Sequence, residues 1–348
     1  MIDHRAFNVT IKELPLSEYE RWDAYVDEHP ESSFFHLSGW KRVIEGVYGH
    51  RSYYLYAEAN GSVLGVLPLA HIRSRLFANA LISTPFCVYG GVLADTPRVA
   101  EALVEHACGL ANDLGVDYLE LRNFNAKPMG WPEKDIYVTF RKALAPDAET
   151  NLASIPRKQR AVVRKGISAG LRSELDSDTT QFYRIYSESV RNLGTPVFPA
   201  RYFKALKQIF RARCEVLTVS KNGLTLSSVM SFYFRDEVLP YYGGGTKEAR
   251  DLKANDFMYW ELMRRAVEKG IRLFDYGRSK RGSGSFSFKR NWGFGATPLH
   301  YEYFLVKARE IPDINPMNPK YKTLIGLWQR LPLPVSRLLG PVLAKNLG

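Results

Sequence analysis

The stretch from Ile271 to Thr297 combines cations, glycines and serines in a way that suits the binding of an anion. An apolar run ends at Gly277, and three cations follow it closely: Arg278, Lys280 and Arg281. Gly282 and Gly284 lie among the serines that come next. Glycine lets the backbone turn sharply and approach a ligand closely, and neighbouring cations attract phosphate groups. The stretch therefore indicates a loop that holds a phosphate-bearing donor substrate.

A second group of cations lies in the run IPRKQRAVVRKGISAGLR, which begins at Ile155 and contains no acidic residue. In a helix, three of its arginines would share one face because of their spacing: Arg157, Arg160 and Arg164. Such a stripe suits the phosphates of RNA or of a nucleotide-linked substrate. A solvated helix face carries the same pattern, so the sequence leaves both interpretations open.

The composition is that of a globular protein with excess positive charge. The chain has 348 residues, 45% of them hydrophobic and 24% charged, and its formal net charge is +12. This length predicts two domains, and the hydrophobic content excludes a disordered chain. The net charge indicates an anionic partner such as RNA, a membrane surface or a phosphorylated substrate.

The cysteines form neither a metal-ligand spacing nor a disulfide framework, because the three are far apart in the sequence: Cys87, Cys108 and Cys214. We expect no metal site, and no cofactor beyond the donor substrate itself. The N-terminal residues carry charges where a signal peptide has its apolar core. These features predict a protein of the reducing cytoplasm.

The two halves of the chain repeat one order of elements. A hairpin is predicted at Asn60-Gly61 in the first half and at Asn222-Gly223 in the second. Each half continues with an apolar strand ending in glycines, a helix and a further strand, at 86–91, 97–114 and 116–123 and again at 239–245, 256–269 and 271–278. Four matching elements in the same order indicate a duplicated domain.

Glycines and polar residues mark the ends of the two predicted helices. Gly115 and Gly270 fit the C-terminal stops, and Asn255 or Asp256 fits the N-cap of the second helix. Glu120 and Asp275 then occupy equivalent positions in the strands that follow. The two halves therefore place a carboxylate at the same point of the repeated plan.

The order of hairpin, strand, helix and strand predicts an α/β fold with a mixed sheet and helices packed on it. It is the order of the acyltransferase fold known as GNAT, here expected twice in tandem. A GNAT enzyme that uses acetyl-CoA holds the pyrophosphate with Gln or Arg, two residues, Gly, one residue, then Gly or Ala. Gly282 and Gly284 fit the glycines, but Ser279 stands at the Gln or Arg position and the loop follows a different strand. The sequence therefore does not support a CoA site.

Several motifs resemble the Fem family of peptidyltransferases. They are the two-domain plan, the basic helix that opens the second domain, and Phe288-Lys289 followed by Trp292-Gly293-Phe294-Gly295. DYGRSKRGSGSFSFKRNWGF and the ending NPKYKTLIGLWQRLPLPVSRLLGPVLAKNLG are similar to the Fem-related subfamily found with exosortase (PEP-CTERM) and exopolysaccharide loci of Gram-negative bacteria. The resemblance covers nearly the whole chain. Fem enzymes transfer an amino acid from aminoacyl-tRNA to an amine on a peptidoglycan precursor, so it implies an aminoacyltransferase.

The resemblance implies roles for residues of the Ile271–Thr297 stretch. In the Fem family the lysine of the Phe-Lys element helps to stabilise charge near the donor, which makes Lys289 the first catalytic candidate. An amine that attacks an activated ester needs a positive group near the developing oxyanion and no enzyme nucleophile. The three cations after Gly277 would hold donor phosphates. Asp275 is a candidate to orient or deprotonate the amine, and it fits equally well as a structural carboxylate bonded to nearby backbone or to Arg278.

Aromatic residues are the candidates for the substrate cleft. Tyr242 lies next to Gly243–Gly245, while Phe288 and Trp292 flank the lysine, and all three also suit a core. In the first domain, FFHLSGWKRVIEGVYGH resembles the Fem segment that contacts the acceptor, with Trp40 and Lys41 at the nearest positions.

The predicted domains are 1–145 and 146–310, followed by a basic tail at 311–348. From Lys320 onward the tail contains no acidic residue, and it alternates leucines and Trp328 with cations. This pattern is typical of a peripheral anchor on anionic lipid, here at the inner face of the plasma membrane. A segment that packs on the protein or on a second subunit shows it too.

Three functions stay open at this point. The first is a Fem-like transfer of an aminoacyl or acyl group to an amine on a peptidoglycan or exopolysaccharide precursor. The second is an N-acyltransferase that uses acyl-CoA. The third is an adaptor of an exopolysaccharide or protein-sorting system that performs no catalysis.

Overall fold

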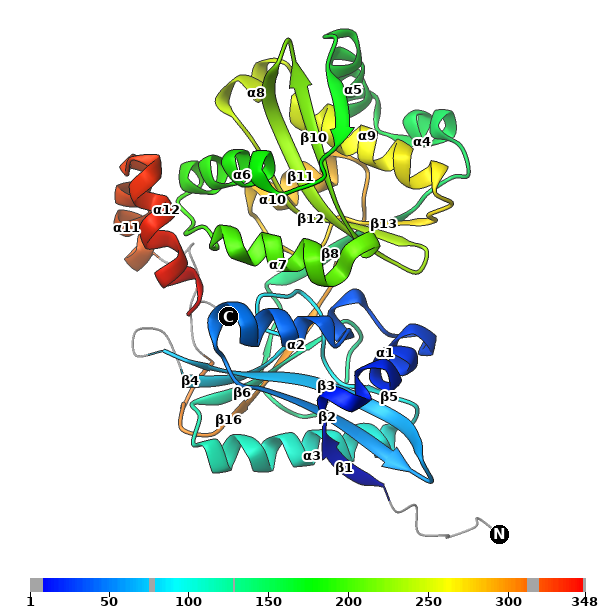
Figure 1. Ribbon diagram of the computed structural model, residues 1–348, viewed down its shortest axis with the longest axis vertical. Helices are drawn as coiled ribbons and strands as arrows, with labels where there is room; N and C mark the ends of the chain where they lie inside the picture. The colour runs from blue at the N-terminus through cyan, green and yellow to red at the C-terminus, as the bar shows by residue number, and fades with distance from the viewer. Residues whose placement is uncertain (1–8, 75–78, 128, 312–318, 347–348) are drawn as a thin grey trace. The chain divides into compact units, whose positions relative to one another are not determined.

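The computed structural model describes residues 9–74, 79–127, 129–311 and 319–346 of the chain (Figure 1). The chain divides into two compact units. Unit 1 comprises Met1–Asp135, Leu299–Asp313 and Asn346–Gly348, and unit 2 comprises Ile136–Pro298 and Ile314–Lys345. Each unit contains one large sheet with helices packed against it, as the alternation of elements predicted.

The sheet of unit 1 runs in the order β1-β2-β3-β4-β6-β16-β7, with β5 paired to β3. β4 and β6 are parallel, and the other pairs are antiparallel. The strands are β1 (Thr10–Glu13), β2 (Ser52–Ala59), β3 (Ser62–Arg73), β4 (Asn79–Ser83), β5 (Leu93–Ala94), β6 (Tyr118–Asn123), β7 (Glu133–Lys134) and β16 (His300–Leu305).

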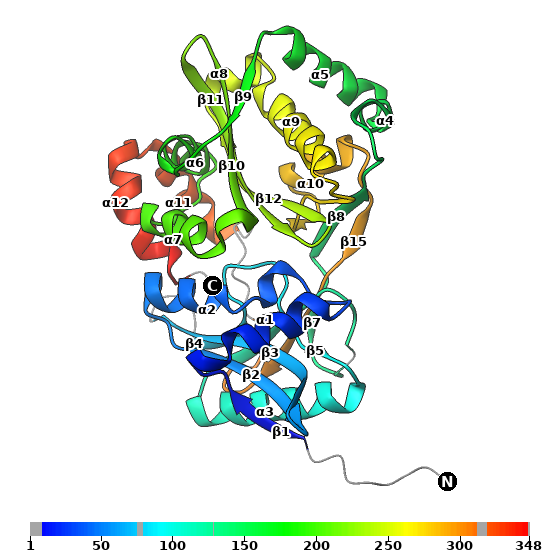
Figure 2. The same cartoon turned by 45° about the vertical axis from the view of Figure 1, so that its right-hand side comes forward.

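Helix α3 (Pro97–Leu114) covers one face of this sheet, and α1 (Tyr19–Glu28) and α2 (Gly39–Val43) lie on the other (Figure 2). α3 has the bounds predicted from the sequence. The Thr96 side chain caps it by accepting a hydrogen bond from the amide of Val99, and Gly115 ends it in the left-handed conformation. Short helical turns occupy Leu16–Glu18, Phe34–His36 and Ile44–Tyr48.

The sheet of unit 2 runs in the order β14-β8-β13-β12-β11-β10-β9, with β15 paired to β8. β12 and β13 are parallel, whereas the other pairs are antiparallel. The strands are β8 (Tyr137–Ala143), β9 (Arg172–Leu175), β10 (Cys214–Lys221), β11 (Leu224–Phe234), β12 (Glu237–Gly245), β13 (Leu273–Asp275), β14 (Ser279–Lys280) and β15 (Ala296–Pro298).

Helices cover both faces of the unit 2 sheet (Figure 2). One face carries α5 (Arg157–Ser168) and α9 (Ala254–Glu268), whose apolar residues form a core with Leu217, Val229 and Phe274. The other face carries α6 (Thr180–Asn192) and α7 (Ala200–Phe210). The remaining elements before the tail are α4 (Ala148–Ser154), a short turn at Arg211–Arg213, α8 (Lys247–Asp251) and α10 (Gly284–Asn291).

Both predicted hairpins are present, and their turns show why the sequence signalled them. Asn60 and Gly61 have φ values of 50° and 79°, and Asn222 and Gly223 have 50° and 78°. Positive φ at both central residues is the geometry that Asn-Gly favours between paired strands. The helix stop at Gly270 is also confirmed by its φ of 78°.

Three local predictions were wrong. No strand forms at 86–91, because Phe86 and Gly90 have positive φ, which an extended strand does not allow; β4 occupies that place in the order instead. The N-cap of α9 is Lys253 rather than Asn255 or Asp256. Residues 284–291 form helix α10 rather than loop, because the Ser283 side chain accepts a hydrogen bond from the amide of Phe286 and so caps the helix.

The unit boundaries differ from the predicted division at 145 and 310. β8 pairs with β13, β14 and β15 and so belongs to unit 2, although the sequence placed it before the boundary. β16 pairs with β6 and β7 in unit 1, although it follows all other strands in the chain. A strand belongs to the sheet whose strands it is hydrogen-bonded to, whatever its position in the chain. Single cuts at 145 and 310 therefore cannot separate the two units.

The tail forms α11 (Pro319–Arg330) and α12 (Leu333–Ala344), drawn in orange-red to red in Figure 1, and both contact α6 within unit 2. Arg191 on α6 donates to the carbonyls of Gln329 and Leu331 at 3.3 and 3.2 Å. One face of the tail therefore packs on its own unit. In the part of the chain that the structure describes, no helix has the length and apolar character needed to cross a membrane.

Candidate functional site

The candidate site of unit 2 is built on a bulge in the strand that pairs with β8. Asp275 lies opposite Arg141 at the end of β13, and Ser279 lies opposite Val138 at the start of β14. Residues 276, 277 and 278 therefore face only residues 139 and 140. Gly277 has a φ of 67°, a conformation that glycine adopts without strain. Bulges of this kind re-aim backbone groups and are frequent next to active sites.

The side chain of Asp275 holds the amide side of the bulge. Its Oδ1 atom accepts hydrogen bonds from the Gly277 amide at 2.6 Å and from Thr139 Oγ1 at 3.1 Å. Its Oδ2 atom forms an ion pair with Arg141 Nε at 3.4 Å. The residue is 0% exposed. Asp275 thus contacts backbone, as one of the two sequence interpretations predicted, and it also forms an ion pair with Arg141.

The side chain of Lys289, on α10, holds the carbonyl side of the same bulge. Its Nζ atom donates to the carbonyl of Gly277 at 2.8 Å and to that of Arg278 at 2.9 Å. Burial lowers the pKa of Lys289 to about 7, against the opposing attraction of Asp275. Near neutral pH this amine therefore exists in both protonation states.

The two protonation states of Lys289 differ in the hydrogen-bonding group that they present outside the bulge. An ammonium group has three N–H donors, and the two carbonyls occupy two of them. Protonated Lys289 has one more N–H to give, and neutral Lys289 has a lone pair in its place. A group with this property and a pKa near 7 suits charge stabilisation and proton transfer.

A second acid, half-buried, lies near Asp275. Glu237, at the start of β12, accepts a hydrogen bond from Arg141 Nη2, so this arginine lies between Glu237 and Asp275. Burial, with the neighbouring charge of Asp275, raises the pKa of Glu237 to about 8, and Arg141 opposes this shift. Two carboxylates that share one arginine repel each other, and this repulsion favours the protonated form of Glu237.

The loop cations gather near one aromatic ring. The Arg278 guanidinium lies 4.7 Å from the centroid of the Tyr137 ring, and Lys280 Nζ lies 5.7 Å from it. Arg281 is exposed at the end of β14, where its amide donates to the Ile136 carbonyl. The structure therefore brings Arg278 and Lys280 together beside the bulge that Lys289 holds.

Helix α5 presents its cations along a groove of about 390 Å³. The groove is lined by Arg157, Arg160, Ala161, Arg164, Lys165 and Ser168. The opposite face packs inward: Val163 is fully buried, and a Cβ atom on Gly166 would lie 2.8 Å from Phe257 Cβ. The shared arginine face that the spacing predicted is therefore real, and it is fixed by close packing on α9.

The aromatic cleft candidates of unit 2 lie in packed clusters. The Tyr242 hydroxyl is hydrogen-bonded to that of Tyr202 at 2.8 Å, and its ring contacts Phe203 and Tyr186. Trp292 is fully buried, and Phe288 is half-buried against it. Their environment is that of core residues, the alternative that the sequence left open.

The acceptor candidates of unit 1 are also held by internal contacts. Trp40 is fully buried, and its Nε1 atom donates to the Phe34 carbonyl at 3.2 Å. Lys41 is 8% exposed, and its Nζ atom donates to Glu45 Oε1 at 2.9 Å and to the Ser52 carbonyl at 3.0 Å. These partners explain the burial of both residues by internal contacts.

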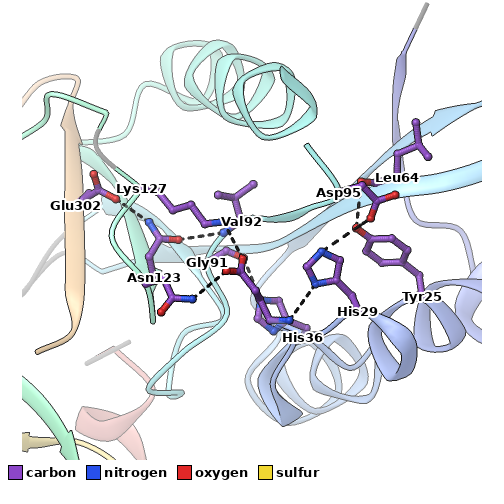
Figure 3. Close-up of polar contacts among 12 residues, drawn as sticks. Tyr25, His29, His36, Leu64, Gly91, Val92, Asp95, Asn123, Lys127 and Glu302 are labelled. Atoms are coloured by element: carbon purple, nitrogen blue, oxygen red, sulfur yellow. Dashed lines mark hydrogen bonds and ion pairs between the residues drawn. The ribbon is translucent and has the colours of Figure 1, made fainter. Parts of the chain in front are cut away.

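Unit 1 contains a polar network in which His36, Asn123 and Glu302 are buried (Figure 3). Asn123 Nδ2 donates to Glu302 Oε2 at 2.7 Å, and Asn123 Oδ1 accepts from the amide of Val92. His36 accepts from the amide of Ser33 on Nδ1, so its Nε2 atom carries the proton toward the carbonyl of Gly91 at 3.1 Å. Burial lowers the pKa of His36 to about 4. The network is neutral at this histidine and serves the fold.

Glu120 and Asp275, which the sequence placed at equivalent positions of the two halves, each lie in a strand and pair with an arginine. Glu120 is buried and accepts a hydrogen bond from Arg122 Nε at 2.8 Å, as Asp275 faces Arg141. The bulge, the lysine and the loop cations described above belong to unit 2. Unit 2 is therefore the better candidate for chemistry. Among the residues that the structure describes, no group of three or more His, Cys, Asp or Glu side chains is placed to bind a metal.

Sequence reasoning missed Thr139, Arg141 and Glu237. The first two come from β8, which the predicted division placed at the end of the first domain. A signal existed, because residues two apart in a strand share a face, and this alternation aligns Thr139 with Arg141. Glu237 had no such signal, since its approach to Asp275 depends on the parallel pairing of β12 with β13.

Comparisons with known proteins agree with this fold. Residues 153–290 match the family model described as an acetyltransferase (GNAT) domain, so unit 2 contains an acyltransferase domain of the GNAT type. The crystal structure of FemX is similar, with a TM-score of 0.69 at 14% identity over 91% of this chain and 100% of that chain. A tandem GNAT protein from the clavulanic acid biosynthesis pathway has a TM-score of 0.55 at 13% identity, over 87% of this chain and 100% of that chain. The predicted tandem GNAT fold is confirmed.

A sequence relative points to the Fem group. The chain is 26% identical over 129 residues to the lipid II:glycine glycyltransferase of Staphylococcus haemolyticus (strain JCSC1435). The match covers 34% of this chain and 31% of the relative, so it spans about a third of each. It supports the resemblance to Fem peptidyltransferases that the motifs indicated. The resemblance to the exosortase-associated subfamily stays a prediction.

Proposed function

We propose that the chain is a Fem-type N-acyltransferase, which moves an aminoacyl or acyl group from an activated donor to an amine on a cell-envelope precursor. The observation that carries the proposal is the position of Lys289, half-buried at a strand bulge with a pKa of about 7 inside a GNAT acyltransferase domain. The peptidoglycan precursor is the favoured acceptor because the sequence relative is a lipid II:glycine glycyltransferase.

The reaction makes limited demands on the protein. The acceptor nitrogen forms a bond to the donor carbonyl carbon, the carbon–oxygen or carbon–sulfur bond to the leaving group breaks, and the nitrogen loses a proton. The third N–H of protonated Lys289 would donate to the oxyanion that forms. The leaving oxygen or sulfur takes up a proton, which the same amine group can supply.

Asp275 acts in this proposal as a positioning residue. A side chain that is 0% exposed and bonded to Gly277, Thr139 and Arg141 cannot reach an acceptor amine. It fixes the amide side of the bulge, and the bulge in turn fixes the carbonyls that orient Lys289. The proton of the acceptor nitrogen would leave to solvent or to neutral Lys289.

The donor is best matched by aminoacyl-tRNA. The cationic groove of α5 and the loop cations Arg278, Lys280 and Arg281 suit a polyanion with many phosphates. A CoA pyrophosphate site has less support, because Ser279 at the expected Gln or Arg position is buried and only 4% exposed. Both donors are made in the cytoplasm, where the reaction is expected.

A transfer assay with two donors tests the proposal. Purified protein is incubated with charged tRNA or with acyl-CoA and a muramyl-pentapeptide precursor, and the mass of the acceptor is followed. We expect transfer from charged tRNA, and a loss of about 10²-fold or more in kcat for Lys289→Met. Lys204→Met, at an exposed lysine on α7, is the matched control.

The outcomes separate the candidate functions. Transfer from acyl-CoA alone would replace the tRNA donor and keep the enzyme. A Lys289→Met variant as fast as the Lys204→Met control would refute the assigned role of Lys289. A folded protein that transfers from neither donor would be consistent with an adaptor, and the proposed activity would be wrong.

A further inference from the structure

Helix α12 places its large apolar residues outward and its small residues inward. Val335, Leu338, Leu339 and Val342 are exposed, and their spacing of three and four residues puts them on one face. Ser336, Gly340 and Ala344, four residues apart, are buried. A helix that packs on a soluble protein normally buries its large apolar stripe. The arrangement in α12 is the reverse.

Close packing and hydrogen bonds fix this orientation. A Cβ atom on Gly340 would lie 2.9 Å from the backbone of Val197, so only glycine allows this approach. Arg337 Nε donates to Ser187 Oγ at 2.9 Å, and Arg337 Nη2 donates to the Arg184 carbonyl at 3.3 Å. Arg337 thus holds the helix on α6, and Gly340 packs against Val197 in the segment after α6.

Helix α11 also exposes large apolar side chains. Leu324 and Leu327 are 61% and 58% exposed and lie three residues apart, while a Cβ atom on Gly194 would contact Ile325 on the inward side. Of the eleven large aliphatic side chains exposed among the described residues, six lie on α11 and α12. We call these six the tail apolar face. A concentration of this kind marks an interaction surface.

The charge of the tail identifies the partner. From Ile314 to Gly348 the sequence contains no Asp or Glu, but it contains five cations: Lys320, Lys322, Arg330, Arg337 and Lys345. Exposed aliphatic residues in a segment that carries cations and no acids are the pattern of helices that lie in the interface of an anionic bilayer. We propose that the tail apolar face docks on an anionic lipid surface.

A second copy of the chain fits this face less well. A symmetric dimer brings the same patch of both copies together, so the tail cations of one copy would face those of the other. Each chain also carries a net charge of +12. Like charges across an interface oppose association, whereas anionic headgroups neutralise them.

Vesicle co-sedimentation of the full-length protein tests the inference. The vesicles are phosphatidylcholine alone or phosphatidylcholine mixed with anionic phosphatidylglycerol. We expect binding to the mixed vesicles, weakened by high salt because salt screens the charge term. The double variant Leu338→Ser/Leu339→Ser should bind the mixed vesicles at least about tenfold more weakly than the parent, because it removes two apolar side chains from the interface.

Matched controls keep the test decisive. Leu16→Ser and Leu224→Ser remove leucines that are similarly exposed but lie outside the tail, and these variants should bind as the parent does. Arg330→Gln should weaken binding to the mixed vesicles only. Equal binding to both vesicle types, unchanged binding of the double variant, or self-association that the double variant abolishes would each overturn the inference. The outcome is independent of whether the chain transfers acyl groups.

Discussion

At the scale of single residues, the bulge between β13 and β14 is held by two side chains of opposite charge, Asp275 and Lys289, which bind different backbone groups. Asp275 accepts from the amide of Gly277, and Lys289 donates to the carbonyls of Gly277 and Arg278. The Gly277 amide and the carbonyls of Gly277 and Arg278 thereby gain side-chain partners, while the Tyr276 amide still donates to the Phe140 carbonyl of β8. The same contacts leave Lys289 able to gain or lose a proton without releasing the bulge.

The low pKa of Lys289 predicts a pH dependence of the transfer reaction. If the protonated form stabilises the oxyanion, kcat/KM should fall as pH rises above about 7, the pKa of Lys289. Lys289→Arg keeps its charge at all accessible pH, so the ratio of parent to Lys289→Arg activity should fall about tenfold per pH unit above that value. The acceptor amine titrates equally in both proteins and cancels in the ratio.

The pH dependence of the free energy of unfolding provides an independent measurement of the Lys289 pKa. Native Lys289 releases its proton at a lower pH than the unfolded chain does, so between about pH 7 and 10.5 the unfolded state binds more protons. The free energy of unfolding should therefore rise with pH in this window, by at most about 1.4 kcal/mol per unit. Lys289→Met should lack this rise, and an identical slope in both proteins would contradict the pKa assignment.

At the scale of elements, the position of α5, and with it the cationic groove, depends on the close contact of Gly166 with Phe257 of α9. Gly166→Ala would place a Cβ atom 2.8 Å from Phe257 Cβ and 3.2 Å from the Lys253 carbonyl, so α5 would have to move from α9. We expect a loss of about 1–3 kcal/mol in urea unfolding, together with weaker tRNA binding. Gly109→Ala in α3 meets nothing within 4 Å and should gain about 0.5–1 kcal/mol. A Gly166→Ala protein as stable as the parent would rule out the tight contact.

Elements with strong local signals could be predicted from the sequence, and those that depend on distant pairing could not. Helix α3 shows three local signals, a Thr cap, an apolar period and a terminal glycine, and its predicted bounds are confirmed. β4, β8 and β16 are short and lack a flanking Asn-Gly turn, so their places in the sheets follow only from their partners. The candidate site divides in the same way, since Lys289 lies in a motif but Arg141 and Glu237 come from other strands.

At the scale of the whole molecule, the connectivity of the two units determines which fragments can fold. Unit 1 needs β16, because Tyr301 donates to the Val88 carbonyl at 2.6 Å and Glu302 accepts from Asn123. A fragment of residues 1–145 lacks β16 and carries β8 without its sheet. We expect it to aggregate or to melt without cooperativity, since an unpaired edge strand promotes association.

A rearranged fragment is the control for this prediction. Residues 1–135 joined by a flexible linker to residues 299–311 restore β16 to its neighbours β6 and β7. This protein should give a cooperative thermal transition by circular dichroism. Cooperative melting of the 1–145 fragment would show that β16 is dispensable.

Because β16 comes late in the chain, β6 is synthesised long before its partner strand. After β6 ends at Asn123, the ribosome must add 182 residues (305 − 123) before β16 is complete. At 5–20 residues per second this takes about 10–40 s. Throughout that interval the nascent chain exposes one edge of β6 to other chains. Slow translation between the two strands lengthens this exposure, so the yield of soluble protein should depend on translation rate there as well as on the stability of the finished fold.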